Sequence, residues 1–166
     1  MEVRSIEAIV RALNAANVQY LIVGGLAVNA HGYERLTRDV DLVIGLEPGN
    51  IARGLRALMG MGYQMAIPVS PEEFADSKQR ETWRKEKNMI VLKMWNDGHR
   101  RTPVDVFVYE PFDFAVEFAA AQWLPVAGDA KAPIVSISAL VAMKQAAGRD
   151  KDLQDIQALR KIEKFR

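Results

Sequence analysis

Apolar residues recur every three or four positions along much of the chain, which is the spacing of helices that bury one face. We therefore expect four helices, at residues 5–16, 48–59, 137–147 and 150–164. Pro48 suits a first helical position because its backbone angle is already helical. Gly148 separates the last two helices and suits the left-handed residue that ends many helices. Shorter helical stretches are expected at 26–31 and after Pro111.

Short runs of β-branched and aromatic residues between these helices indicate buried strands. We expect strands at residues 19–23, 39–44, 63–67, 89–95, 104–109 and 123–126. The turn residues at 96–98 suit a hairpin between the fourth and fifth of these strands. The stretch 68–87 is polar and charged, and we expect a surface loop or a short irregular helix there.

The alternation of strands and helices, without repeats or linkers, predicts an α/β or α+β fold in which helices flank a mixed sheet. We expect a single domain over residues 1–166, with a core at about 1–127 and a C-terminal helical pair at about 136–165. The composition, 49% apolar and 26% charged, is that of a soluble globular protein. No apolar run reaches the roughly 20 residues that a membrane span requires, so we expect no membrane association.

The chain contains no cysteine, which excludes a disulfide framework, a zinc–thiolate site and a cysteine nucleophile, and which fits a reducing compartment. Charged residues interrupt the apolar pattern of residues 1–17 and break up any signal-peptide core, so we expect a cytoplasmic protein. The net charge of +1 gives no overall attraction to nucleic acids or anionic membranes. The basic clusters at 78–87 and 99–101 fit a solvated loop surface and a phosphate-binding surface equally well.

Two aspartates, Asp39 and Asp41, stand two positions apart in the strand expected at 39–44. Strand periodicity places both carboxylates on one face of the sheet, with Cα atoms about 7 Å apart. Each carboxylate raises the pKa of the other unless a cation neutralises them, and hard Mg²⁺ prefers such oxygen ligands. The alternative is structural, with Asp39 capping a turn and Asp41 facing solvent on an edge strand.

Asp105 is an acid inside an apolar strand, where an unpaired carboxylate is costly to bury. If its strand lies beside the strand of Asp39 and Asp41, the three carboxylates can converge on a divalent metal. The alternative for Asp105 is an outward-facing position on an edge strand.

Gly24 and Gly25 lie between a strand and a helical turn, where backbone N–H groups can approach a triphosphate.

The segment 21–27 (LIVGGLA), followed by 38–43 (RDVDLV), resembles the signature of the DNA polymerase β-like nucleotidyltransferase superfamily. That signature is a hydrophobic run with Gly-Gly or Gly-Ser, a spacer, and then Asp-hydrophobic-Asp or Asp-hydrophobic-Glu. The tail at 138–156 is similar to the C-terminal helices of the small bacterial branch related to AbiEii-type toxins. Together the two matches span most of the chain.

The resemblance implies that Asp39, Asp41 and Asp105 hold Mg²⁺ or Mn²⁺, with Asp105 helping to activate the attacking hydroxyl. It also implies that Gly24 and Gly25 bind the phosphates of an NTP. Metal ions would clamp the attacking and leaving oxygens in line, so that the protein mainly positions groups.

Further site residues follow from the same resemblance. Thr37 and Arg38 fit a position that touches phosphate, although Arg38 could instead pair with Glu34 or an aspartate. In the bacterial branch a lysine and an aspartate of the helical tail are functional, and Lys144 and Asp155 match them best. We therefore expect Lys144 to be catalytic and Asp155 to help bind the nucleotide. The alternative is a surface lysine and a solvated acid.

The function predicted first is Mg²⁺-dependent transfer of an NMP from an NTP to an acceptor, which is RNA, protein or a small molecule. The bacterial branch also suggests a toxin–antitoxin component with a cognate antitoxin protein as partner. The alternative is a catalytically inactive nucleotide- or protein-binding module of the same fold. A two-metal nuclease or phosphatase uses similar carboxylates, but Gly24-Gly25 favours a triphosphate substrate. The chain is shorter than the longer AbiEii-type toxins, so the resemblance does not extend to their large acceptors.

Overall fold

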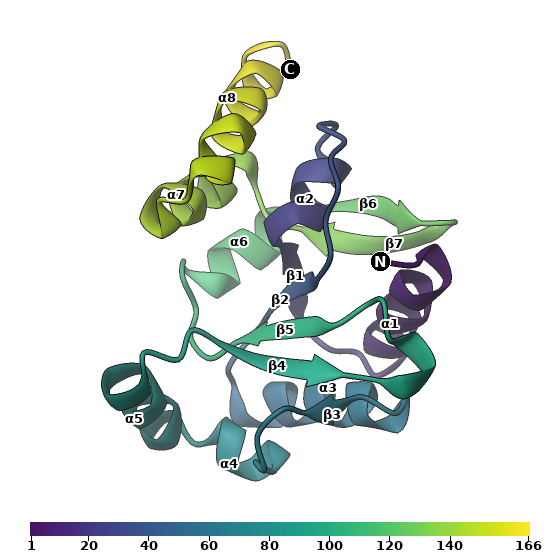
Figure 1. Ribbon diagram of the computed structural model, residues 1–166, viewed down its shortest axis with the longest axis vertical. Helices are drawn as coiled ribbons and strands as arrows, with labels where there is room; N and C mark the ends of the chain where they lie inside the picture. The colour runs from purple at the N-terminus through teal and green to yellow at the C-terminus, as the bar shows by residue number, and fades with distance from the viewer.

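The computed structural model describes residues 1–166, the whole chain, and folds seven strands into one mixed sheet (Figure 1). The strands are β1 (Tyr20–Val23), β2 (Val40–Ile44), β3 (Gln64–Met65), β4 (Val91–Trp95), β5 (Val104–Phe107), β6 (Gln122–Ala127) and β7 (Ala130–Ile134). Their order across the sheet is β3-β4-β5-β2-β1-β7-β6. β1 runs parallel to β7 and β2 runs parallel to β5, whereas the other neighbouring pairs are antiparallel.

Helices connect these strands and cover the sheet. They are α1 (Val3–Ala15), α2 (Gly24–Ala30), α3 (Pro48–Gly60), α4 (Pro71–Ala75), α5 (Ser77–Lys87), α6 (Phe114–Ala120), α7 (Ile137–Ala147) and α8 (Asp150–Lys164), with a 3₁₀ turn at Asp97–His99. α1 and α3 pack against each other and against the sheet, while α2 packs on β1 and β2. α7 and α8 pack together at one end of the molecule, as Figure 1 shows.

The two central strands are buried on both faces, so the core lies along β1 and β2. All four residues of β1 are buried, and β2 is buried at every position except Asp41. Strands that read as continuous apolar runs are typical of sheets covered by helices on both sides. The core is a cluster of 38 buried apolar residues. Asp41 is therefore the one point at which β2 is open to a cavity.

The fold class expected from the sequence, a mixed sheet flanked by helices, is confirmed. The four long helices are also confirmed, as α1, α3, α7 and α8. Pro48 begins α3, and the carboxylate of Glu47 accepts hydrogen bonds from the N–H groups of Gly49 and Asn50. Gly148 follows α7 with a φ of 63°, in the left-handed region that glycine adopts without strain.

The expectation of a loop or irregular helix at 68–87 is wrong, because two regular helices, α4 and α5, occupy this stretch. The side chains of Ser70 and Asp76 each accept a backbone hydrogen bond at the start of α4 and α5, respectively. The rings of Phe74 and Trp83 are buried, with centroids 5.9 Å apart. Two helix-capping side chains and two buried aromatic rings thus stabilise α4 and α5, although the composition of the segment is polar.

The strand expected at 123–126 is confirmed as β6, but the sequence-based prediction lacks its partner β7. The β7 sequence, AKAPI, includes Pro133 and only one β-branched residue, which is unfavourable for a strand. β7 is nevertheless largely buried and pairs Ile134 with Ile22 of β1, so tertiary contacts fix it. β3 is shorter than expected, and Asp39 lies directly before β2 rather than within it.

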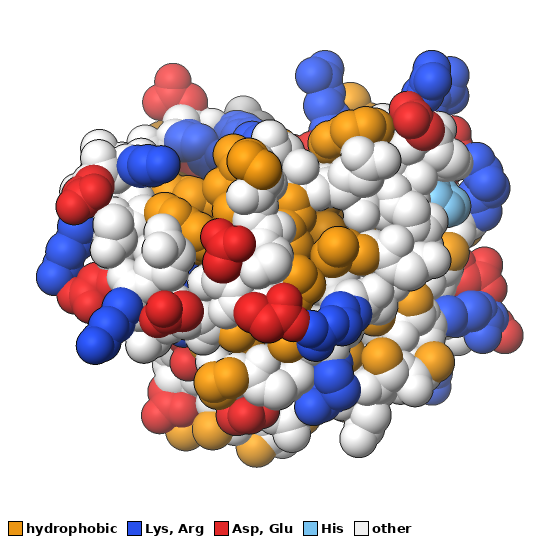
Figure 2. All heavy atoms as spheres, turned by 90° about the horizontal axis from the view of Figure 1, so that it is seen from below, with side chains coloured by type: hydrophobic (Ala, Val, Ile, Leu, Met, Phe, Trp, Pro, Cys, Tyr) orange, Lys and Arg blue, Asp and Glu red, His pale blue; other side chains and the backbone are white.

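The surface carries no large area of one charge on the face drawn in Figure 2, where acidic and basic side chains alternate with apolar ones. This mixture agrees with the net charge of +1. None of the helices combines the length and the apolar character needed to cross a membrane.

Candidate functional site

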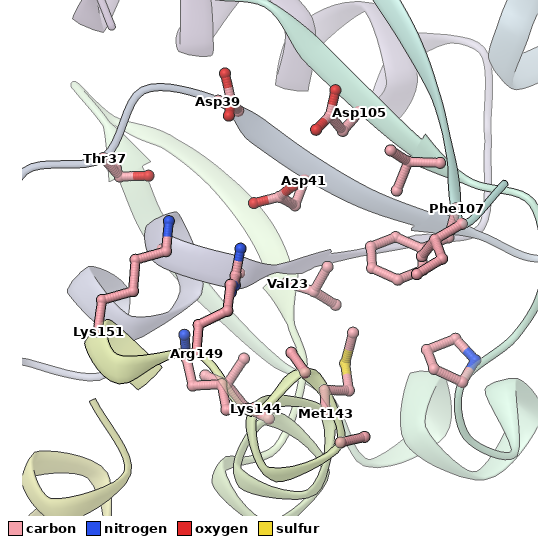
Figure 3. Close-up of a pocket in the computed structure, with 18 of the residues that line it drawn as sticks. Val23, Thr37, Asp39, Asp41, Asp105, Phe107, Met143, Lys144, Arg149 and Lys151 are labelled. Carbon is pink, nitrogen blue, oxygen red and sulfur yellow. The ribbon is translucent and has the colours of Figure 1, made fainter. Parts of the chain in front are cut away.

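A cavity of about 810 Å³ lies between the sheet and the C-terminal helices. Residues of β1, β2, β5 and the segment before β2 form one wall, and α7 with the start of α8 forms the other. Figure 3 shows aspartates on the sheet wall, Arg149 and Lys151 across from them, and Phe107 and Met143 toward one end. Acidic, basic and apolar regions therefore meet in one cavity.

The acidic region consists of Asp39, Asp41 and Asp105, which all line the cavity. Asp41 stands directly opposite Asp105 in the register of β2 and β5, and Asp39 lies just before β2. Neighbouring strands lie about 4.8 Å apart, so the fold holds these two carboxylates side by side. β5 is an interior strand between β4 and β2, which excludes the edge-strand alternative for Asp105.

The charges of these aspartates are poorly compensated within the chain. Of the three, only Asp105 has an ion-pair partner, with Lys93 Nζ lying 3.4 Å from both of its carboxylate oxygens. Burial, then repulsion from Asp105 and Asp39, raises the pKa of Asp41 to about 7, against the opposing influence of Arg149 and Lys144. Burial also raises the pKa of Asp105, although the Lys93 ammonium partly offsets this effect.

The donor chemistry of the aspartates fits a hard divalent cation such as Mg²⁺. Three carboxylates face one cavity, and neither Asp39 nor Asp41 has an ion-pair partner that a metal would have to displace. As they stand, no three acidic, histidine or cysteine side chains are gathered closely enough to hold a metal ion. A metal would therefore draw the carboxylates together. The ligand set remains a prediction from the sequence.

Gly24 and Gly25 form the first turn of α2 and lie against the acidic region. Gly24 has a φ of 64°, and a Cβ atom there would overlap the carboxylate of Asp41. A Cβ atom on Gly25 would overlap the hydroxyl of Thr37. Glycine is thus required at both positions for close packing. The same packing leaves backbone N–H groups of α2 at the cavity, where an anion can approach them.

Basic residues line the cavity on both walls. Arg149 and Lys151 lie across from the sheet, and Figure 3 shows them directed toward the aspartates. Arg38 and Thr37 line the cavity from the segment before β2, on the sheet side. The sequence-based alternative for Arg38, an ion pair with Glu34 or an aspartate, is not observed among the ion pairs of the chain. The basic clusters at 78–87 and 99–101 do not line the cavity, which favours their solvated interpretation.

Lys144 and Asp155 belong to a buried ion network rather than to the solvated surface. Lys144 Nζ lies 2.7 Å from Asp155 and 3.2 Å from Asp152, and all three side chains are at most 5% exposed. Hydrogen bonds from Arg149 and Lys144 overcome burial and lower the pKa of Asp152. Lys144 also lines the cavity, whereas Asp155 does not. Its carboxylate instead contacts Arg35, from the segment before β2.

The apolar region has aromatic residues from β5 and the segment that follows it. Phe107 and Tyr109 lie with ring centroids 5.9 Å apart, and the guanidinium of Arg84 covers the Tyr109 ring at 3.7 Å. Met143 of α7 and the half-exposed Ile90 also line the cavity. This end offers a surface for a planar or apolar group.

Several residues that line the cavity have no role in the sequence-based prediction, namely Arg35, Lys93, Phe107, Tyr109, Arg149 and Lys151. Arg149 and Lys151 do carry a local signal, because both lie within three residues of Gly148, at the start of α8. The others come from strands and loops whose proximity depends on the tertiary fold. Their residue types carry no local signal.

Solved structures with the same arrangement of elements are nucleotidyltransferases. The solution structure of the antibiotic-resistance factor ANT(2'')-Ia is similar with a TM-score of 0.63 and 16% identity, over 97% of this chain and 86% of that one. Lincosamide antibiotic adenylyltransferase LnuA, solved with lincomycin, has a TM-score of 0.56 and 15% identity over 90% of each chain. The chain therefore has the nucleotidyltransferase fold.

An antigenic nucleotidyltransferase-like protein from Paracoccidioides brasiliensis is also similar, with a TM-score of 0.56 and 19% identity over 95% of this chain and 75% of that one. No family model matches the sequence, and no curated protein does. These similarities, all at 19% identity or less, show the fold alone.

Because the pKa of Asp41 is raised, we expect a neutral residue at this position to stabilise the fold relative to the wild type, by an amount that grows with pH. The unfolded pKa is near 3.8 and the folded pKa about 7, so the folded protein loses stability as pH rises between these values. Asp41→Asn removes the penalty. In the presence of a metal chelator we expect almost no change in Tm at pH 4 and an increase on the order of 10 °C at pH 8, because three pKa units correspond to about 4 kcal/mol.

The matched control is Asp97→Asn, because Asp97 is 72% exposed and its only ion pair, with Arg100, is long at 3.6 Å. Its Tm should follow that of the wild type at every pH. Parallel Tm curves for Asp41→Asn and the wild type from pH 4 to 8 would show that Asp41 is not electrostatically strained.

Proposed function

We propose that the protein transfers an NMP from an NTP to an acceptor in a reaction that depends on Mg²⁺ or Mn²⁺. The observation that carries this proposal is the placement of three aspartates beside Gly24 and Gly25 in one cavity. Paired carboxylates suit a divalent metal, and the N-terminal turn of α2 suits phosphate oxygens. An oxygen of the acceptor would attack the α-phosphorus, and pyrophosphate would leave.

Each region of the cavity has a task in this reaction. Asp39, Asp41 and Asp105 would hold the metal, which neutralises phosphate charge and aligns the attacking and leaving oxygens. Asp105 also orients the acceptor hydroxyl and accepts its proton, a role that its raised pKa favours. The side chains of Arg149 and Lys151 bind the departing pyrophosphate from across the cavity.

Backbone and side-chain groups next to the aspartates complete the phosphate site. Gly24 and Gly25 let the triphosphate approach the start of α2, and Thr37 offers a hydroxyl beside Gly25. Arg38 contributes a charge at the same wall. Lys144 lies at the cavity with its ammonium held by two aspartates, so it adds to the positive potential without being free to move.

The solved structures support a small-molecule acceptor. LnuA was crystallised with lincomycin, and ANT(2'')-Ia was crystallised with adenylyl-2''-tobramycin, a nucleotidylated product. We propose that this chain likewise modifies a small molecule. RNA and protein are the alternative acceptors. A toxin–antitoxin role with a cognate antitoxin is a narrower form of the proposal, supported by the AbiEii-like pattern at 138–156.

One observation favours the alternative function, a nucleotide- or protein-binding module without catalysis. The Lys93 ammonium lies beside Asp105, where it supplies part of the positive charge that a metal would provide. If Lys93 replaced the metal, nucleotide binding would not require Mg²⁺. The two functions therefore differ in the metal dependence of nucleotide binding.

We expect Mg²⁺ and an NTP to stabilise the protein jointly, by more than the sum of their separate effects. Without metal, the aspartates repel the triphosphate, and without nucleotide, the metal lacks phosphate ligands. Ligand at about 100 times its Kd adds roughly 2.7 kcal/mol, which raises the Tm by about 5–10 °C. The measurement is a thermal melt with Mg²⁺, with each of the four NTPs, and with each pair.

The melt is repeated on Asp39→Ala, with Asp129→Ala as the control because Asp129 is 87% exposed and lies outside the cavity. The joint stabilisation should vanish in Asp39→Ala and persist in the control. If an NTP alone stabilises the wild type and Asp39→Ala equally, the enzyme proposal is wrong and the binding-module function takes its place.

A further inference from the structure

Arg35 connects the C-terminal helices to the segment that carries the site residues Thr37 and Asp39. Its Nη2 donates a hydrogen bond to Asp155 at 2.9 Å, and its Nε lies 2.7 Å from the other oxygen of the same carboxylate. Asp155 is fully buried in α8 and also accepts a hydrogen bond from Lys144 at 2.7 Å. One carboxylate therefore joins α7, α8 and the segment before β2.

The backbone of Arg35 is fixed as firmly as its side chain. The side chain of Asn29, on α2, accepts a hydrogen bond from Arg35 N at 3.1 Å and donates one to Arg35 O at 3.0 Å. The Arg35 guanidinium also donates to the carbonyl of Leu36 at 2.9 Å. A Cβ atom on Gly25 would lie only 3.1 Å from Arg35 Nη2, so the guanidinium packs on the first turn of α2.

The segment between α2 and β2 has no regular structure and includes Leu36, which is 83% exposed. The position of this segment thus depends on a few side-chain contacts. Arg35 makes several of them, and it lies just before Thr37 and Asp39 in the chain. Two guanidinium nitrogens of Arg35 donate hydrogen bonds, to Leu36 and Asp155, while Nε lies within ion-pair distance of Asp155 without forming a hydrogen bond. The guanidinium is thus bound mainly to protein groups, although it also lines the cavity.

We propose that Arg35 is a positioning residue for nucleotide binding. It sets the location of Lys144 through Asp155, and it sets the location of Thr37 and Asp39 through its own backbone. The role rests on the proposed function, because it concerns the site for the metal and the triphosphate. If Arg35 has this role, a change in how the C-terminal helices dock also changes the shape of the phosphate site.

The charge balance of the network shows which partner can be removed without loss of the fold. Arg35, Lys144 and Arg149 face Asp152 and Asp155. Loss of Arg35 leaves two cations and two anions, whereas loss of Asp155 leaves three cations and one anion in a buried site. An uncompensated buried charge is strongly destabilising, so the informative substitution is at Arg35.

The experiment compares Arg35→Met with Arg11→Met, the control. Arg11 is the control residue because it also forms ion pairs with carboxylates, those of Glu7 and Asp129, but on the exposed surface away from the cavity. Calorimetry measures the Kd of α,β-methylene analogues of ATP, GTP, CTP and UTP with Mg²⁺, well below the Tm of each variant. We expect binding about 10-fold weaker in Arg35→Met and unchanged in Arg11→Met.

Arg35→Lys separates positioning from charge. A lysine restores the positive charge but cannot contact both oxygens of Asp155 in the same geometry. We expect its Kd to stay close to that of Arg35→Met. Recovery of wild-type affinity in Arg35→Lys would mean that only the charge of Arg35 matters, and it would overturn the positioning role.

The remaining outcomes are also decisive. Wild-type affinity in a fully folded Arg35→Met refutes the inference and leaves the proposed function intact. Failure of the wild type to bind any analogue with Mg²⁺ refutes the proposed function itself. If Arg35→Met does not fold, the affinity of Arg35→Lys decides, since that variant keeps the network charge.

Discussion

The site depends on one electrostatic constraint, the side-by-side placement of Asp41 and Asp105 on parallel neighbouring strands. Two carboxylates at one register position repel each other, and partial burial removes the water that would weaken this repulsion. Burial first, and repulsion from Asp105 and Asp39 second, raise the pKa of Asp41 to about 7. Gly24 is needed next to Asp41 because any larger residue would overlap its carboxylate. The fold thus maintains an unfavourable contact that a divalent cation would turn into a favourable one.

The C-terminal helices supply the opposite charge. Arg149 lowers the pKa of Asp41 from across the cavity, and it is itself held by Asp152. Asp152 and Asp155 hold Lys144 in turn. Such buried networks are costly unless every charge is paired, so they indicate a fixed arrangement more than a source of stability. The arrangement keeps cations near the aspartates without neutralising them, which suits a site for a metal and a polyphosphate.

The sequence predicts the parts of this site that have local signals. Asp41 and Asp105 are acids within apolar strands, and Gly24 lies at a strand-to-helix junction, so each is unusual in its immediate context. The long helices follow from apolar spacing for the same reason. Arg35 and Phe107 are ordinary residues whose roles depend on contacts with distant parts of the chain. β7 and the helices at 68–87 escape prediction because burial and capping override an unfavourable composition.

The most direct test of the account follows the phosphorus atoms of the NTP. The protein is incubated with Mg²⁺ and NTPs labelled at the α- or the γ-phosphate, with lincomycin, tobramycin, RNA and protein as separate acceptors. Nucleotidyl transfer requires that one acceptor gain the α-label, that pyrophosphate carry the γ-label, and that Asp105→Asn do neither. Transfer of the γ-label to an acceptor, release of labelled orthophosphate alone, or undiminished transfer by Asp105→Asn would contradict it.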